Sequence, residues 1–322
     1  MSFSWKKLLS SIIALLLCAC GGTPSGALYY GALGFGKPKI IISNADATAP
    51  VQHTITMYDE NGTLLKVLAD YTDLADRPRG LTLWGSFSFL VPIEGTDRID
   101  IVDIFGVRNT WATNAQFTGN IFKSVNDSSG NVYVIETNTI ERFLASGERA
   151  QQSSATPYIA ATLGTCVLST PRGMAIAPTT GYLVVSNTGN DRVNIYNVNA
   201  TPATCVSFNS ASYTTADPLP ILTHTNGSMY IGTQTADLIR KVSADGVTVS
   251  TAWSTSLTVM GDPTAIAELP DTNILVASDL TDSVERFSLD STGNTLTRVG
   301  SGPFIKNAFT TAVTEILVIP GK

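Results

Sequence analysis

The sequence contains few of the side chains on which most enzyme chemistry depends. Its 322 residues include two histidines and four cysteines, and only 14% of the residues are charged. Since the histidines, His53 and His224, lie far apart in the chain, a metal centre built from several histidines is excluded. The chain also lacks a Gly-x-Ser-x-Gly elbow, a His-Glu-x-x-His motif and a glycine-rich phosphate loop, the motifs of three common enzyme classes.

Positive charge is scarce as well. The chain has 20 Lys and Arg against 26 Asp and Glu, a net charge of -6, and no basic cluster. Because nucleic-acid phosphates are bound by clustered cations, a nucleic-acid partner is excluded. The 43% of hydrophobic residues, the 26 glycines and the 15 prolines, without a long amphipathic helix, are typical of an all-β chain.

The chain does contain a repeat. Residues 171–198 read as three short strands joined by tight turns, and weaker copies begin at Pro78, Ile121, Pro220 and Pro263. The period of roughly 45 residues is typical of β-propeller blades. The sequence therefore predicts an all-β propeller of six blades, with a seventh, degenerate blade within residues 145–166 as the alternative.

The two ends of the repeat region are each incomplete. Residues 39–68 contain later strands of a blade but no first strand. Residues 303–320 have strand character, enough for one strand or two, but no third or fourth strand follows. We expect the N- and C-terminal strands to pair and complete one blade, because such closure removes an exposed sheet edge.

The clearest repeat carries a known family pattern. The matching residues are Pro171, Gly181, Asn187, Gly189, Asn190 and Arg192. At these positions the chain resembles the NHL repeat, which builds β-propellers. The resemblance implies that Asn187, Gly189, Asn190 and Arg192 form a structural turn motif, in which the Asn187 side chain caps the turn that follows it.

The first twenty residues are typical of an export signal. Lys6 and Lys7 precede an apolar run at 8–17, and the tetrad Leu-Cys-Ala-Cys at 17–20 resembles a bacterial lipobox. The resemblance predicts a signal peptide at 1–19, a lipidated Cys20 with a flexible tether at 20–37, and one propeller domain at 38–322. It places the protein on a bacterial membrane, with the outer membrane as the expected one. An uncleaved anchor is the alternative, disfavoured because about ten apolar residues are too short for a ~30 Å hydrocarbon core.

Two further cysteines, Cys166 and Cys205, lie on either side of the clearest repeat. In an oxidising compartment we expect them to form a disulfide, which would stabilise the domain by about 3 to 4 kcal/mol. The alternatives are two buried free thiols or a metal site. Neither cysteine has a His or Cys neighbour at ligand spacing, which disfavours the metal site.

Candidate catalytic and metal-binding residues are few. His224, expected on an innermost strand, is a candidate general base together with Glu268, against the simpler interpretation of a hydrogen-bonded channel histidine. Asp262 and Glu268 are candidate ligands for a calcium ion in the channel. A further acidic or amide residue ends the second strand of several repeats, namely Glu94, Glu136, Asn187 and Asp279. Because it recurs in this way, turn capping is favoured over metal binding.

These features favour a binding protein over an enzyme. The expected function is a lipid-anchored scaffold or recognition module for an envelope protein or glycan, attached to the membrane through its lipid, with no cofactor. The alternative, since related propeller families contain such enzymes, is a calcium-dependent lactonase-like hydrolase or a lyase with its site in the central channel. The long connection at 145–170 is a candidate binding loop.

Overall fold

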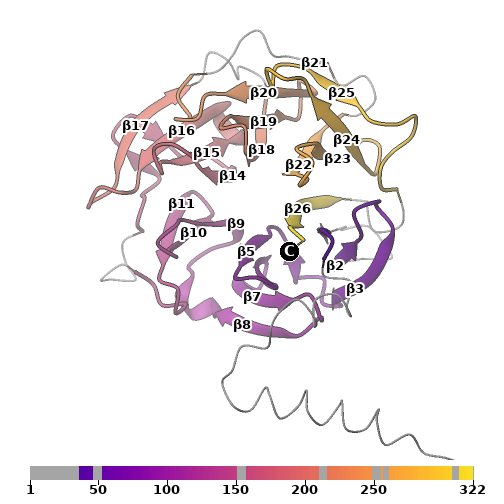
Figure 1. Cartoon of the computed structure of the whole chain (residues 1–322). Helices are drawn as coiled ribbons and strands as arrows, with labels where there is room; N and C mark the ends of the chain where they lie inside the picture. The colour runs from indigo at the N-terminus through magenta and orange to yellow at the C-terminus, as the bar shows by residue number, and fades with distance from the viewer. Residues whose placement is uncertain are drawn as a thin grey trace, which may run out of the picture.

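The structure is a computed structural model that describes residues 36–45, 53–150, 157–209, 216–248, 255–256, 261–306 and 312–321. In these segments, six sheets form blades around a common axis, and their inner strands lie nearest the centre (Figure 1). The predicted six-bladed propeller is confirmed. Among these segments no helix has the length and apolar character needed to cross a membrane.

Each blade runs from an inner to an outer antiparallel strand. Blade 1 comprises β26 (Val313–Ile319), β1 (Lys39–Ala45), β2 (His53–Tyr58) and β3 (Leu64–Tyr71). Blade 2 begins with two short inner strands, β4 (Arg77–Pro78) and β5 (Thr82–Trp84), followed by β6 (Ser88–Glu94), β7 (Arg98–Asp103) and β8 (Arg108–Ala112). A 3-10 turn, η1 (Asn114–Gln116), leads to blade 3, with β9 (Ile121–Asn126), β10 (Val132–Glu136) and β11 (Thr139–Phe143).

The second half of the ring repeats this plan. Blade 4 comprises β14 (Pro171–Ile176), β15 (Leu183–Asn187), β16 (Arg192–Asn197) and β17 (Thr204–Asn209), with the 3-10 turn η2 (Thr188–Asn190) between β15 and β16. Blade 5 comprises β18 (Pro218–Thr223), β19 (Met229–Thr233), β20 (Leu238–Val242) and β21 (Thr255–Ser256). Blade 6 comprises β22 (Pro263–Glu268), β23 (Ile274–Ser278), β24 (Ser283–Leu289) and β25 (Leu296–Arg298).

The ring closes through the two ends of the chain, as predicted. The C-terminal strand β26 is the inner strand of blade 1 and pairs antiparallel with β1, in a register that places Ile40 opposite Val318 and Ile42 opposite Ile316. Every residue of β1 is buried. Pairing with β26 therefore covers the edge of β1 that would otherwise be unpaired.

The core lies between the blades. The described residues form six buried apolar clusters, one at each interface between neighbouring blades. The second strands β10, β15, β19 and β23 are buried along their full length. Because neighbours cover both faces of each blade, these strands read as continuous apolar runs rather than as alternating patterns, which is why the repeats were visible in the sequence.

Polar contacts between successive blades supplement this packing. The side chains of Asn138, Asp191 and Asp237 follow the second strands of blades 3, 4 and 5. Each accepts a hydrogen bond from the backbone N–H of a residue just before the next inner strand: Thr170 at 2.8 Å, Asp217 at 2.9 Å and Asp262 at 2.7 Å. We call Asn138, Asp191 and Asp237 the inter-blade latches. The three donor residues have φ values of 45° to 50°, so the latches hold a left-handed turn at the start of each inner strand.

The connection at 145–170 is not a seventh blade. In its described part, Ile159 is fully buried and exchanges backbone hydrogen bonds with Ile140 of β11, which extends blade 3 outward. The chain then forms a hairpin of β12 (Thr162–Leu163) and β13 (Cys166–Val167). Much of this connection is therefore packed structure, although residues 151–156 lie outside the described segments.

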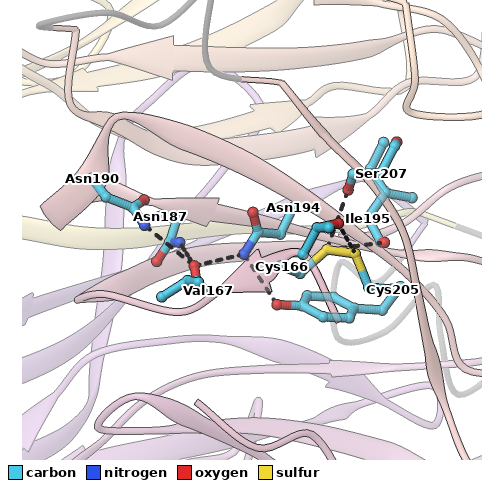
Figure 2. The surroundings of a disulfide bond; sticks show 10 residues. Cys166, Val167, Asn187, Asn190, Asn194, Ile195, Cys205 and Ser207 are labelled. Atoms are coloured by element: carbon cyan, nitrogen blue, oxygen red, sulfur yellow. Dashed lines mark hydrogen bonds between the residues drawn. A yellow bond between two sulfur atoms is a disulfide. The ribbon is translucent and has the colours of Figure 1, made fainter. Parts of the chain in front are cut away.

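The predicted disulfide between Cys166 and Cys205 is confirmed, and it joins β13 to the outermost strand of blade 4. Figure 2 shows that the side chains of Asn187, Asn190 and Asn194 converge on the backbone carbonyl of Val167, the residue after Cys166. A covalent bond and three amide donors thus fix the segment that leads into the inner strand of blade 4.

Candidate ligand site in the channel mouth

The inner strands enclose two cavities, one at each end of the axis. The cavity at the end where the inner strands begin, the channel mouth, has a volume of about 320 Å³. The cavity at the end where they finish, the channel exit, has a volume of about 400 Å³. Both are lined by Lys123 and Glu315, so this pair lies between them.

Three cations from three neighbouring blades line the channel mouth: Arg79 of blade 2, Lys123 of blade 3 and Arg172 of blade 4. Two carboxylates, Asp279 and Glu315, also line it. Arg79 and Arg172 occupy equivalent places at the beginning of their inner strands, and Lys123 lies one position further along, where blade 4 has Gly173. On a chain of net charge -6, this is a local concentration of positive charge.

Two of the three cations already have carboxylate partners. Arg79 forms an ion pair with Glu94, which Arg77 also approaches at 3.6 Å. Lys123 forms an ion pair with Glu315 of β26. Burial lowers the pKa of the Lys123 ammonium group to about 7, and the Glu315 carboxylate acts in the opposite direction by favouring the charged form.

Arg172 is different. Its guanidinium lies 3.6 Å from the centre of the Phe122 ring, and its Nη1 is buried without a hydrogen-bond partner. Burial lowers the pKa of this guanidinium. An unsatisfied buried donor on a charged group costs free energy, so Arg172 is the group at the mouth that an incoming acceptor would satisfy.

The channel exit is chemically unlike the mouth. Its lining is mainly aliphatic, and the polar residues on it are Thr82, Ser124, Asn126, Thr223 and Glu268, besides the shared Lys123 and Glu315. The Thr82 hydroxyl is already bonded to Ser124, and the Thr223 hydroxyl donates to the Ile176 carbonyl at 2.9 Å.

The two candidate catalytic residues do meet near the exit, since His224 Nε2 lies 3.4 Å from Glu268 Oε1. His224, however, is in the turn after β18, is 3% exposed and does not line the cavity. Its Nδ1 accepts from the Asn226 backbone N–H at 3.0 Å, so Nε2 carries the proton and donates to the Thr272 carbonyl at 3.1 Å. Glu268 accepts from the backbone N–H and the hydroxyl of Thr225. Both side chains join blades 5 and 6, and both nitrogens of the His224 ring are already hydrogen-bonded.

The proposed calcium ligands do not meet. Asp262 precedes β22 and Glu268 ends it, so the two residues lie at opposite ends of this strand. In the described segments there is no group of three His, Cys, Asp or Glu placed to hold a metal ion. At the mouth, three cations accompany the two carboxylates, and their repulsion makes the donor set a poor fit for calcium.

Two of the four residues expected to cap turns at the ends of second strands, Glu136 and Asn187, are caps, but they act on a different segment. Glu94 instead pairs with Arg77 and Arg79, and Asp279 lines the channel mouth. Glu136 accepts from the backbone N–H of Gly119 at 2.7 Å and of Thr118, and Asn187 accepts from that of Ser169 at 2.6 Å. These donors precede the inner strand of the same blade. Asn187 makes no side-chain bond to the turn η2 that follows it, so the expected cap of the following turn is corrected to a cap of the preceding connection.

The rest of the turn motif surrounds η2. Gly189 lies so close to the preceding connection that a Cβ atom there would come within 2.8 Å of the side chains of Ser169 and Thr170, which explains the glycine. Asn190 ends η2 and donates to the Val167 carbonyl at 3.3 Å, and Arg192 begins β16. The predicted lipidation site Cys20 lies outside the described segments.

Sequence reasoning missed the cationic cluster at the mouth. One signal was available: the tripeptide Pro-Arg-Gly occurs at 78–80 and again at 171–173, both times at the start of an inner strand. Nothing comparable marks Lys123 or Glu315, which become partners only when β26 closes the ring.

The fold defines the class of protein as a six-bladed β-propeller, and comparison with known proteins agrees. No protein-family model and no curated protein sequence matches the chain, so its NHL resemblance stays a prediction. Among solved structures, a chain of the nidogen/laminin complex is similar with a TM-score of 0.64 and 12% identity, over 88% of this chain and 99% of that one.

Two enzymes are also similar in fold. The periplasmic gluconolactonase of Pseudomonas aeruginosa has a TM-score of 0.56 and 12% identity, over 88% of this chain and 99% of that one. The virginiamycin B lyase of Staphylococcus aureus has a TM-score of 0.53 and 13% identity, over 70% of each chain. At these identities the likeness concerns the fold alone, which hosts both binding proteins and enzymes.

Proposed function

We propose that the protein is a lipid-anchored binding module of the bacterial cell envelope, whose propeller recognises a protein or glycan partner at the channel mouth. The observation that supports this most is the contrast in hydrogen bonding within the channel. The titratable groups at the exit are satisfied by the protein itself, whereas Arg172 at the mouth has an unused donor beside a cavity of about 320 Å³. Such a volume is at the lower end for small-ligand pockets.

Membrane attachment rests on the lipobox-like tetrad at 17–20. The test is mass spectrometry of the N-terminal peptide from full-length protein expressed in a bacterium. We expect a lipid on Cys20, lost in Cys20→Ala and retained in the matched control Cys18→Ala. An unprocessed N-terminus in the unsubstituted protein would contradict the anchor.

Partner binding is tested in the same cells by crosslinking the full-length protein and isolating it from the envelope fraction. We expect a protein or glycan that is captured by the unsubstituted chain and lost when the mouth is altered by Arg172→Gln. Equal capture by both would place the partner elsewhere on the propeller and contradict the proposed site.

A propeller enzyme is the second candidate, and one observation favours it. Lys123 and Glu315 form a buried acid–base pair between the two cavities, with the pKa of Lys123 lowered by burial to about 7. Proton transfer at neutral pH needs groups of this kind. Two structural neighbours are named as a gluconolactonase and a lyase. If the protein is an enzyme, Lys123 and Glu315 would transfer protons, rather than His224 and Glu268.

The enzyme candidate is tested by screening lactone and ester substrates with the purified protein, together with metal analysis and thermal melting with and without a chelator. Turnover that is abolished by Lys123→Met would establish it. Stoichiometric calcium and a melting temperature that falls on chelation would support the calcium-dependent form. Absence of turnover, with partner capture intact, would leave the binding function in place.

A further inference from the structure

We propose that the ligand of the channel mouth is a hydroxylated carboxylate, such as a sugar acid, with its carboxylate on Arg172. This inference rests on the proposed function, because it names the ligand of that same site. It depends on three observations: the missing partner of Arg172, the charge of the mouth, and the hydroxyl groups on the opposite wall.

The missing partner is explained by comparing two blades. Blades 2 and 4 both begin with Pro-Arg-Gly, and in blade 2 the arginine, Arg79, pairs with Glu94 at the end of the second strand. The strand registers place Thr188 of blade 4 at the position of Glu94, because Pro78 pairs with Ile93 and Pro171 with Asn187. The Thr188 hydroxyl donates to the Pro218 carbonyl at 2.8 Å and carries no charge. Arg172 therefore lacks the internal carboxylate that its counterpart has, and an external carboxylate would take that position.

The charge of the mouth indicates a monoanion. Arg79 pairs with Glu94 and Lys123 pairs with Glu315, which leaves the positive charge of Arg172 as the one at the mouth outside these ion pairs. A carboxylate matches this single charge, whereas a phosphate dianion would exceed it. A planar guanidinium also matches a carboxylate with two parallel hydrogen bonds, which favours Arg172 over Lys123 as the binding group.

The opposite wall of the cavity favours hydroxyl groups on the ligand. Blades 5 and 6 contribute Gln234 and Thr264 to the lining. Thr188 and Thr314 also line the cavity, but their hydroxyls already donate to the carbonyls of Pro218 and Pro78. The Thr264 hydroxyl is buried without a hydrogen-bond partner, so it is the second unsatisfied polar atom on residues of this cavity. A ligand that places a carboxylate at Arg172 and hydroxyls toward Thr264 would satisfy both.

The test is calorimetric titration of the full-length protein, purified in mild detergent, with sodium galacturonate. Galactose is the uncharged counterpart, galactose 6-phosphate tests phosphate, and an acetylated tripeptide with a free carboxylate tests a peptide C-terminus. We expect galacturonate to bind at least about tenfold more tightly than the other three, as loss of a charge-assisted hydrogen bond implies. Equal or tighter binding of galactose, the phosphate or the peptide would overturn the proposal.

The variant Arg172→Gln should weaken galacturonate binding at least about tenfold. Its matched control is Arg108→Gln, because Arg108 also stacks on an aromatic ring, Tyr71, but on the outer strand of blade 2. This control should change the affinity by less than about twofold. Similar losses in both variants would show that the effect is structural and would overturn the assignment of Arg172.

Thermal melting without ligand gives a second readout. Because Arg172 carries an unsatisfied buried donor, Arg172→Met should melt at the same temperature as the unsubstituted protein or higher, while losing galacturonate binding. A lower melting temperature together with retained binding would contradict the proposal. If galacturonate fails to bind but crosslinking still captures an envelope partner, this inference falls and the proposed function stands.

Discussion

The two ends of the channel use similar side chains in opposite ways. At the exit, His224 and Glu268 lie 3.4 Å apart and look like a catalytic pair, yet each is hydrogen-bonded to a backbone group of the neighbouring blade, and His224 also to Asn226 of its own blade. At the mouth, Arg172 belongs to a turn and strand that read as purely structural, yet its guanidinium keeps an unused donor. In this propeller, unsatisfied hydrogen-bonding capacity identifies the site better than residue type does.

The difference follows from how blades are joined. At the exit, the turns of adjacent blades pack against each other, and their polar side chains form hydrogen bonds to the neighbouring blade. At the mouth the same task is done by the latches Asn138, Asp191 and Asp237 and by caps such as Glu136. These residues act on backbone N–H groups, so they do not occupy the Arg172 guanidinium.

The largest effect is expected from the disulfide, which holds the segment before Arg172. Replacing both Cys166 and Cys205 by alanine should lower the free energy of unfolding by about 3 to 4 kcal/mol, because the unfolded chain regains the entropy of the closed loop. Denaturant unfolding of the variant and of the reduced and oxidised unsubstituted protein measures this. A loss below about 1 kcal/mol would show that the amides around Val167 suffice to hold the mouth.

A smaller loss is expected at the exit. His224→Ala removes a buried ring with three polar contacts and should cost about 2 to 3 kcal/mol of stability, while galacturonate binding and any turnover stay unchanged in the folded protein. Glu268→Gln serves as the milder control, since its amide oxygen can still accept from Thr225. Lost binding or turnover in folded His224→Ala would reverse the assignment of the two ends.

The latches should contribute less. Asp237→Ala leaves the backbone N–H of Asp262 without its acceptor at 2.7 Å and should lower the free energy of unfolding by about 1 kcal/mol. Asp237→Asn keeps an acceptor and should recover most of this loss. Equal losses in the two variants would mean that charge, rather than the hydrogen bond, stabilises the interface between blades 5 and 6.

The smallest effect concerns pH. Below about pH 7 the Lys123 ammonium is charged and offsets the Glu315 carboxylate. Above this pH, deprotonation of Lys123 leaves the negative charge of Glu315 uncompensated at the mouth. Galacturonate affinity should therefore be constant below the pKa of Lys123 and weaken several-fold as pH rises through it. In Lys123→Met this pH dependence should vanish. A constant affinity from pH 6 to pH 9 in the unsubstituted protein would remove Lys123 from the site.

Much of the fold could be predicted from the sequence, for reasons visible in particular residues. The second strands are covered on both faces, so Leu183 to Val185 and their counterparts stand out as apolar runs at blade spacing. The incomplete ends predicted the pairing of β26 with β1. Cys166 and Cys205 were the two cysteines left once the export signal was set aside, and they form the expected disulfide.

The ligand site could not be predicted in the same way, because it depends on which arginine lacks an ion-pair partner within the protein. Arg79 and Arg172 occur in identical tripeptides, and they differ because Arg79 pairs with Glu94, whereas the equivalent position in blade 4 is the uncharged Thr188. His224 was interpreted as a channel residue because its neighbours Leu222 and Thr223 are on the inner strand. Strand β18 ends at Thr223, one residue before His224, and the imidazole ring is buried between blades.

The central claim is that ligand binds at the mouth and not at the exit. Threonine methyl groups mark both ends: Thr188, Thr264 and Thr314 line the mouth, and Thr82 and Thr223 line the exit. Methyl NMR spectra of the full-length protein, recorded during a titration with galacturonate, should show shifts of the first three signals and none of the last two. Shifts confined to Thr82 and Thr223 would contradict the account.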